Sequence, residues 1–239
     1  METLSVRACI RYGWQTFKRR PWFLVGVTLL LAVINMIIPS PPEEGAISLM
    51  LGIGVVSVLL SLFLQLAGTA FALRAHDSVT TASLKDLWRP ELYLRYLGTM
   101  LLSMLVIGIA FAIPVGLAFL LYPVIGYASL VALVLVIPGI ILALALSQAG
   151  YLVIDQGQGP VAALKESARI TKGNRGKLLL LGIAVALLVI VGLICLLVGV
   201  LIALPVASIA MAHAYRVLSG TEAQPVVVVE TPAEPVQVA

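Results

Sequence analysis

The feature that most constrains this chain is a run of 59 residues, from Tyr96 to Ile154, that contains no Asp, Glu, Lys or Arg. At 1.5 Å per helical residue, this length is about twice what one crossing of a bilayer needs. A soluble domain in a chain of 239 residues cannot bury so long an apolar stretch. The run therefore predicts two membrane-spanning helices, joined by an uncharged turn between Leu121 and Ser129.

Composition agrees with an integral membrane protein. Hydrophobic residues make up 61% of the chain and charged residues 11%, against about 25% charged residues in soluble domains. We expect an all-α fold, a polytopic membrane helical bundle of six transmembrane helices with interfacial amphipathic helices. The predicted spans are residues 22–38, 46–73, 97–121, 129–154, 178–197 and 199–216, and the predicted interfacial helices are residues 4–18, 83–89 and 160–172.

The distribution of positive charge predicts how these spans are oriented. The last apolar stretch, Leu178 to Tyr215, is too long for one helix across a core of about 30 Å, so we expect a short hairpin near residues 197–199 to divide it. With six spans and both termini in the cytoplasm, all fifteen Lys and Arg lie on the cytoplasmic side. With five spans Arg216 would lie outside, so the positive-inside rule favours six.

The first segment, residues 4–18, has the pattern of an amphipathic helix that lies flat at a membrane surface. Trp14 and Phe17 belong to its apolar face, and Arg11 lies on its polar face. We interpret Cys9 as a small residue of the apolar face, with palmitoylation as the alternative.

The chain reads as one helical domain followed by a tail. A surface helix, a basic break and an apolar hairpin follow one another three times within residues 1–219, either as a true repeat or by convergence. From residue 220 the composition changes to Glu, Pro, Gln, Thr and Val. Residues 220–239 are therefore predicted to be a disordered cytoplasmic tail.

The interiors of the predicted spans hold no Asp, Glu, Lys or Arg, which disfavours an ion-coupled transporter. The strongest polar groups deep in the spans are Asn35, Gln65 and Gln148, which we expect to bridge helices rather than to bind substrate. His213, near the end of the sixth span, is interpreted as an interfacial side chain bonded to backbone or lipid phosphate, with a functional titrating group as the alternative.

Prolines interrupt three of the spans. Each proline removes one backbone hydrogen bond, so the sequence predicts helix kinks at Pro114, Pro138 and Pro205. Broken helices of this kind can line a cavity, as in transporters, or simply be bent structural helices.

Signatures of catalysis are missing from the sequence. His76 and His213 are the two histidines, and no Cys or carboxylate cluster stands at zinc-ligand spacing. The sequence has no nucleophile elbow, phosphate-binding glycine loop or dinucleotide fingerprint. We therefore expect no enzyme activity, no metal and no cofactor. The basic blocks flank spans, which indicates contact with anionic lipid and not with nucleic acid.

Five short motifs stand in order between residues 137 and 174. They are Ile137–Ile140 (IPGI), Tyr151–Asp155 (YLVID), Gly157–Pro160 (GQGP), Ala163–Ser167 (ALKES) and Thr171–Asn174 (TKGN). In these motifs the chain resembles the membrane domain of membrane-anchored glycerophosphoryl diester phosphodiesterases and related uncharacterised bacterial integral membrane proteins. The resemblance covers most of residues 4–219, is specific over about 136–177, and implies a six-span bundle in a bacterial cytoplasmic membrane.

The fused members of that family hydrolyse their substrate in a separate soluble barrel with metal-binding His and carboxylates. These 239 residues hold no counterpart of that barrel, so we expect no phosphodiesterase activity.

Two functions follow from the pattern. The first is a non-catalytic membrane protein whose basic cytoplasmic collar engages anionic lipid headgroups or a membrane partner, a second copy included. The alternative is a small transporter, channel or lipid-moving protein with a cavity beside the proline-broken helices. The residues expected to make the contact of the first function, each of which could instead only fix topology, are Arg19, Arg20, Arg89, Lys172, Asn174, Arg175 and Lys177.

Overall fold

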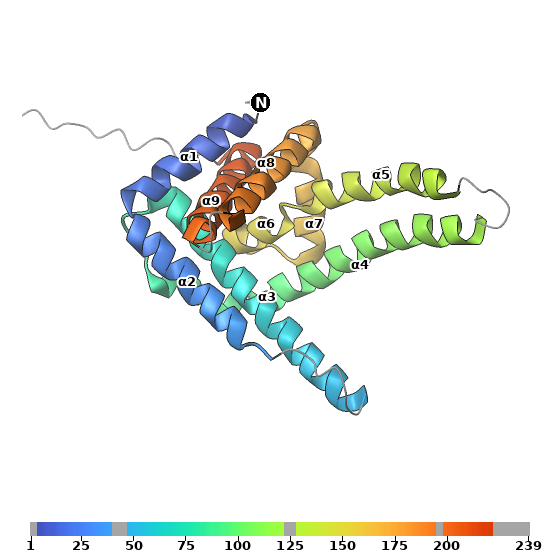
Figure 1. The fold of residues 1–239 in the computed structure, drawn as a ribbon, viewed down its shortest axis with the longest axis horizontal. Coiled ribbons are helices and arrows are strands. Elements are labelled where there is room, and N and C mark those ends of the chain that lie inside the picture. Colours follow the sequence, from blue (N-terminus) through green and yellow to red (C-terminus); the bar gives the residue numbers. More distant parts are fainter. Residues whose placement is uncertain (1–3, 40–46, 122–127, 195–197, 222–239) are drawn as a thin grey trace, which may run out of the picture.

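The computed structural model describes residues 4–39, 47–121, 128–194 and 198–221, and the regular structure in these ranges is entirely helical. The predicted all-α bundle is therefore confirmed (Figure 1). The elements are α1 (Val6–Arg19), α2 (Pro21–Ile37), α3 (Ile47–Ser78), the 3-10 helix η1 (Leu84–Leu87), α4 (Pro90–Leu121), α5 (Ala128–Leu146), α6 (Ala149–Gln156), α7 (Pro160–Ile170), α8 (Arg175–Ile194) and α9 (Val198–Ser219).

Five helical segments among the described residues are long and apolar enough to cross a membrane. They are supplied by α3, α4, the pair α5–α6, α8 and α9, and α2 makes a sixth if it is counted together with α1. The last apolar stretch is divided as expected, because α8 and α9 are separate helices. The hairpin residues 195–197 and most of the predicted tail, residues 222–239, lie outside the described residues.

The first helix lies across the bundle. The axes of α1 and α2 differ by 101° at the break around Arg20, so α1 runs along the membrane surface if α2 spans the membrane. Its buried face packs on α9 (Figure 1). At the crossing, a Cβ on Gly13 would stand 2.5 Å from the Val206 carbonyl oxygen, so only a glycine lets the two backbones approach this closely.

Cys9 and Trp14, both on α1, differ in how deeply they are buried. Cys9 is 1% exposed on the packed face, and burial raises the pKa of its thiol to about 11, which agrees with a small apolar-face residue. Trp14, in contrast, is 43% exposed and lies beside Lys18, whose ammonium is 5.7 Å from the centre of the ring. Trp14 still stacks on Phe17, with ring centroids 5.8 Å apart, as expected for one face, but it lies at the edge of that face, whereas Phe17 is buried in the core.

The fourth span is broken at a place that no proline marks. α5 ends at Leu146 and α6 begins at Ala149, whereas Pro138 lies inside the continuous helix α5. The polar backbone groups at the break are satisfied from α7. The Ser167 hydroxyl donates to the Ala145 carbonyl (2.7 Å) and accepts from the Gln148 backbone N–H (3.2 Å). Pro114 and Pro205 likewise lie inside continuous helices, α4 and α9.

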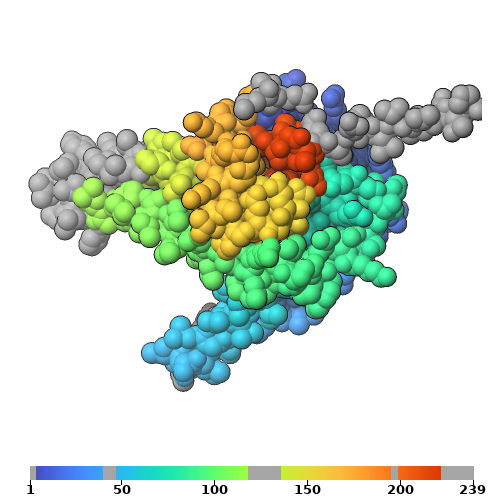
Figure 2. All heavy atoms as spheres, turned by 180° about the vertical axis from the view of Figure 1, so that it is seen from behind, coloured from blue at the N-terminus to red at the C-terminus, as the bar shows by residue number. Residues whose placement is uncertain are grey.

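The body of the molecule forms around α9, which contacts α1, α8, α3 and α2. The largest part of the core joins α3, α4, α6 and α9 through fully buried side chains such as Tyr96, Leu152 and Tyr215. The α2–α3 and α4–α5 hairpins project from this body in different directions, and in Figure 2 they stand out as two separate arms.

Candidate functional site

All basic segments of the chain meet at one end of the bundle, which we term the basic end. The Arg20 guanidinium, where α2 begins, donates to the carbonyls of Val79 (3.2 Å) and Thr80 (2.9 Å), where α3 ends. Arg95, in the first turns of α4, donates to the Gly157 carbonyl after α6. The starts of α2 and α4 therefore lie beside the ends of α3 and α6, as antiparallel spans require.

The residues predicted to bind headgroups lie in three separate segments of this end. Arg19 and Arg20 lie at the α1–α2 break, Arg89 immediately before α4, and the other four, Lys172, Asn174, Arg175 and Lys177, at the turn from α7 into α8. Arg19 and Lys172 are exposed, and the other five are partly buried. Arg20 is already used inside the protein, since it also stacks 4.5 Å over the ring of Phe23.

Within the described part of the chain, no carboxylate compensates the cations of this set. In the described part of the chain, Asp86 pairs with Arg74, Glu166 with Arg169, and Asp77 and Asp155 with Arg216. No carboxylate of the described residues lies within 4.0 Å of the six predicted cations. The basic end therefore presents net positive charge to its surroundings.

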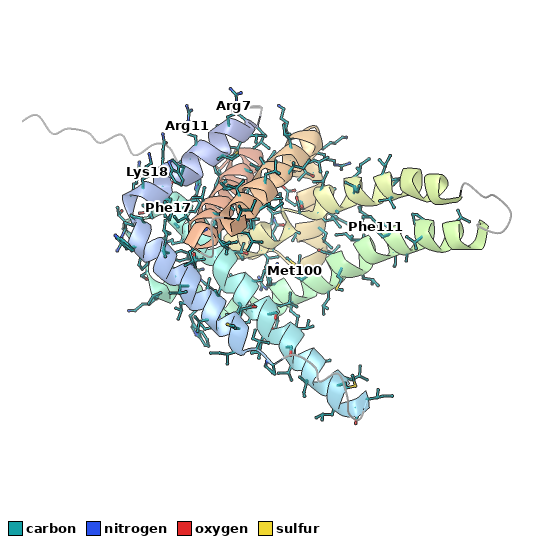
Figure 3. The ribbon with its side chains drawn as sticks, in the orientation of Figure 1. Arg7, Arg11, Phe17, Lys18, Met100 and Phe111 are labelled. Atoms are coloured by element: carbon teal, nitrogen blue, oxygen red, sulfur yellow. The ribbon has the colours of Figure 1, made fainter. Side chains whose placement is uncertain are left out.

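A basic stripe on α1 belongs to the same surface and was missed as part of the site. Arg7, Arg11 and Lys18 are all exposed on the side of α1 that faces away from the bundle (Figure 3). The spacing of four residues between Arg7 and Arg11 gave the signal. The packing of the opposite face of α1 on α9 shows that these three cations lie on the outer surface of the protein.

A charged network ties three helices together at the basic end. The Arg216 guanidinium on α9 donates to both carboxylate oxygens of Asp155 on α6, at 2.9 Å each, and to those of Asp77 on α3, at 3.1 and 2.6 Å. The Tyr215 hydroxyl also donates to Asp155 (2.8 Å). The Arg216 side chain is 9% exposed, so these are largely buried, charge-assisted contacts.

Two histidines extend the network toward α1. His76 Nε2 and His213 Nδ1 are 3.0 Å apart, and His76 Nδ1 lies 3.0 Å from Asp77 Oδ1. The Tyr12 ring stacks on His213, with centroids 4.4 Å apart, and its hydroxyl donates to the His76 carbonyl (2.8 Å). The expectation that His213 bonds to backbone or lipid phosphate is wrong, because its partner is another histidine, 137 residues away in the chain.

A cavity of about 610 Å³ lies between α2, α3 and α9. Pro205 belongs to its lining, whereas Pro114 and Pro138 line neither this cavity nor the apolar groove of about 620 Å³ that adjoins it between α2, α3 and η1. Asn35 and Gln65 are exposed into the cavity, and within the described residues their side chains bond to no other helix, contrary to the expectation that they bridge helices. Gln148 is fully buried, but its side-chain amide does not bridge helices either: its N–H donates to the adjacent Ser147 hydroxyl (3.2 Å), and its carbonyl oxygen has no partner among the described residues. Only its backbone N–H reaches Ser167 on α7.

The described residues form a bundle with five or six apolar spans, and its cations gather at one end, which defines a multi-span membrane protein. Over residues 4–238 the chain matches the family described as Domain of unknown function (DUF7847), and it belongs to that family. No curated protein and no solved structure matches it. The family description assigns no function, and the resemblance to the membrane domain of the phosphodiesterases stays a prediction.

Proposed function

We propose that this chain is a non-catalytic integral membrane protein of a bacterial cytoplasmic membrane whose basic end is a cytoplasmic collar for anionic lipid headgroups, alone or in contact with a membrane partner. The observation that carries the proposal is the set of exposed cations that have no carboxylate partner among the described residues, such as Arg19, Lys172 and the α1 stripe. Each Lys or Arg near an anionic leaflet contributes about 1 kcal/mol of attraction.

The aromatic side chains at this end support the same placement. Trp14 and Trp22 are 43% and 87% exposed, on either side of the α1–α2 break. Tryptophan side chains of this exposure are enriched at the headgroup level of membranes, where the ring is apolar and the indole N–H stays hydrated. The α1–α2 break would then lie at the interface, with the α1 cations beside the phosphates.

The experiment neutralises the α7–α8 turn with the variant Lys172→Gln/Arg175→Gln/Lys177→Gln. The matched control, Arg74→Gln/Lys85→Gln/Arg169→Gln, removes the same number of charges from positions that pair with or adjoin Asp86 and Glu166. Native mass spectrometry then measures the phosphatidylglycerol that stays bound. We expect the first variant to retain at least about tenfold less than the control, because roughly 3 kcal/mol of attraction is lost. Equal retention by the two variants would contradict the proposal.

A second candidate is a small transporter, channel or lipid-moving protein. The specific observation in its favour is that one of the three prolines within spans, Pro205, lines the cavity between α2, α3 and α9. A structure determined in lipid tests it: a bundle whose own side chains fill this cavity would exclude the candidate.

A further inference from the structure

The cavity between α2, α3 and α9 contains polar side chains whose hydrogen bonds the protein does not supply. Of its hydroxyls, Thr28 donates to the Leu24 carbonyl (2.9 Å) and Ser208 to the Pro205 carbonyl (3.0 Å). The side chains of Asn35, Ser61 and Gln65 line the same cavity, yet within the described residues they have no hydrogen-bond partner. All three are exposed into the cavity.

These three side chains lie at hydrocarbon depth. Along the helix axes, Asn35 is about 21 Å from the start of α2 at Pro21, and Gln65 is about 20 Å from the end of α3 at Ser78. Ser61, one turn before Gln65, is about 25 Å from the same end. With the helix ends placed at the surface of a core of about 30 Å, all three fall in the leaflet away from the basic end, where an unpaired amide is strongly unfavourable. An occupant with hydrogen-bonding groups removes that cost.

Charge and size limit what this occupant can be. The cavity has no Asp, Glu, Lys, Arg or His in its described lining, so nothing there compensates an ion. Its volume of about 610 Å³ is typical of a small-molecule site. Asn35, Ser61 and Gln65 are exposed, so the cavity is open on one side, and the chains of a lipid can extend out of it along the adjoining apolar groove.

The cavity is also graded from polar to apolar along the membrane normal. Toward the basic end its walls are hydrocarbon side chains, with Leu24, Phe71 and Ile209 buried there. The apolar groove on the other side of the hairpin adjoins it through Leu31 and Leu64, which line both spaces. This order, polar toward the far surface and apolar on the side of the basic end, matches a lipid whose headgroup lies in the far leaflet.

We propose that this cavity binds one lipid of the leaflet away from the basic end, through an uncharged headgroup that bears hydroxyl groups. The headgroup hydrogen-bonds to Asn35, Ser61 and Gln65, and the acyl chains lie against the apolar walls. The site is separate from the basic collar, and neither the collar nor the transport candidate is needed for it.

The test uses the full chain in phosphatidylcholine nanodiscs with dioleoylglycerol as the probe. Dioleoylglycerol should raise the Tm of the wild type. Dioleoyl phosphatidylglycerol, which has the same chains and a charged headgroup, should not produce this effect at the cavity. The variant Asn35→Leu/Gln65→Met should lose the dioleoylglycerol shift while its own Tm without the probe stays equal or rises, because apolar side chains replace unpaired amides.

Two further variants separate binding from folding. Thr28→Val removes a hydroxyl that its own helix already satisfies and should keep the shift. Gly68→Leu places a side chain into the cavity, where a Cβ meets only Leu31 Cδ1 at 3.6 Å, and should abolish the shift in a folded protein.

Three results would overturn the proposal. The first is no wild-type shift with dioleoylglycerol. The second is a dioleoylglycerol-induced rise in Tm that persists in Asn35→Leu/Gln65→Met. An equal rise in Tm that phosphatidylglycerol produces in the wild type, and that is lost in this variant, would likewise contradict an uncharged headgroup. The third is a cross-linked dimer that forms in the wild type and is lost in the variant, which would assign the polar groups to a second copy.

Discussion

Arg216 holds two carboxylates at once at the point where α3, α6 and α9 end. Its planar fork of donors suits this position, since one edge serves Asp155 and another serves Asp77. We expect Arg216→Met to destabilise the protein by about 3–5 kcal/mol, because it leaves two largely buried carboxylates without a counter-charge. The fall in Tm of the purified protein in nanodiscs measures this loss.

The control for this prediction removes the carboxylates as well. In Arg216→Met/Asp77→Asn/Asp155→Asn no net charge is stranded, so most of the lost stability should return. If the triple variant is as unstable as Arg216→Met alone, the guanidinium stabilises the end by packing and not by neutralising Asp77 and Asp155.

This network shows what the sequence could and could not indicate about single residues. Arg216 was expected to mark the cytoplasmic end of the last span, and it does lie at the basic end. Its pairing with Asp155 and Asp77 could not be predicted, because the partners are 61 and 139 residues away. A charge at the end of a span has the same sequence signature whether it faces lipid phosphate or a carboxylate of another helix.

At the scale of elements, the closest crossing is that of α1 over α9 at Gly13. A Cβ there would meet the Val206 carbonyl oxygen at 2.5 Å and the Ala210 nitrogen at 3.3 Å, both backbone atoms that cannot swing aside. We expect Gly13→Ala to shift α1 and to cost about 1–3 kcal/mol, as overpacking does. The measurement is again the Tm in nanodiscs.

The matched control is the same substitution at Gly182 in α8, where a Cβ meets nothing within 4 Å. Because alanine favours a helix over glycine by about 1 kcal/mol, Gly182→Ala should be neutral or slightly stabilising. A Gly13→Ala variant as stable as Gly182→Ala would contradict the prediction, because it would show that a Cβ at residue 13 fits between α1 and α9.

The elements themselves could be anticipated from hydropathy and basic breaks, because a membrane forces an apolar stretch to satisfy its backbone within a helix. The break between α5 and α6 could not. No glycine or proline stands at Ser147–Gln148, and the break is tolerated because the Ser167 hydroxyl arrives from α7. Ser167 and Thr171, both in motifs that carry the family resemblance, donate to the Ala145 carbonyl, so part of that signature has a structural role.

At the scale of the whole molecule, two regions of opposite chemistry lie at different depths. The basic end gathers charge at one surface, and the cavity on α2, α3 and α9 offers uncharged polar groups near the other. The two proposals therefore address different leaflets. The collar proposal also requires that the basic end faces the cytoplasm.

The orientation is tested by single cysteines placed at residue 44, between α2 and α3, and at residue 222, after α9, in a Cys9→Ala/Cys195→Ala background. With six spans and both termini inside, a membrane-impermeant maleimide should label residue 44 in intact cells and residue 222 only after permeabilisation. If the last apolar stretch crossed the membrane only once, both sites would face outward and label together. Lys85→Cys, in the exposed η1 at the basic end, is the internal control. Residue 85 is expected to be cytoplasmic under either count of spans. Labelling of residue 85 in intact cells would therefore show that the basic end faces outward, with its cations at the outer leaflet.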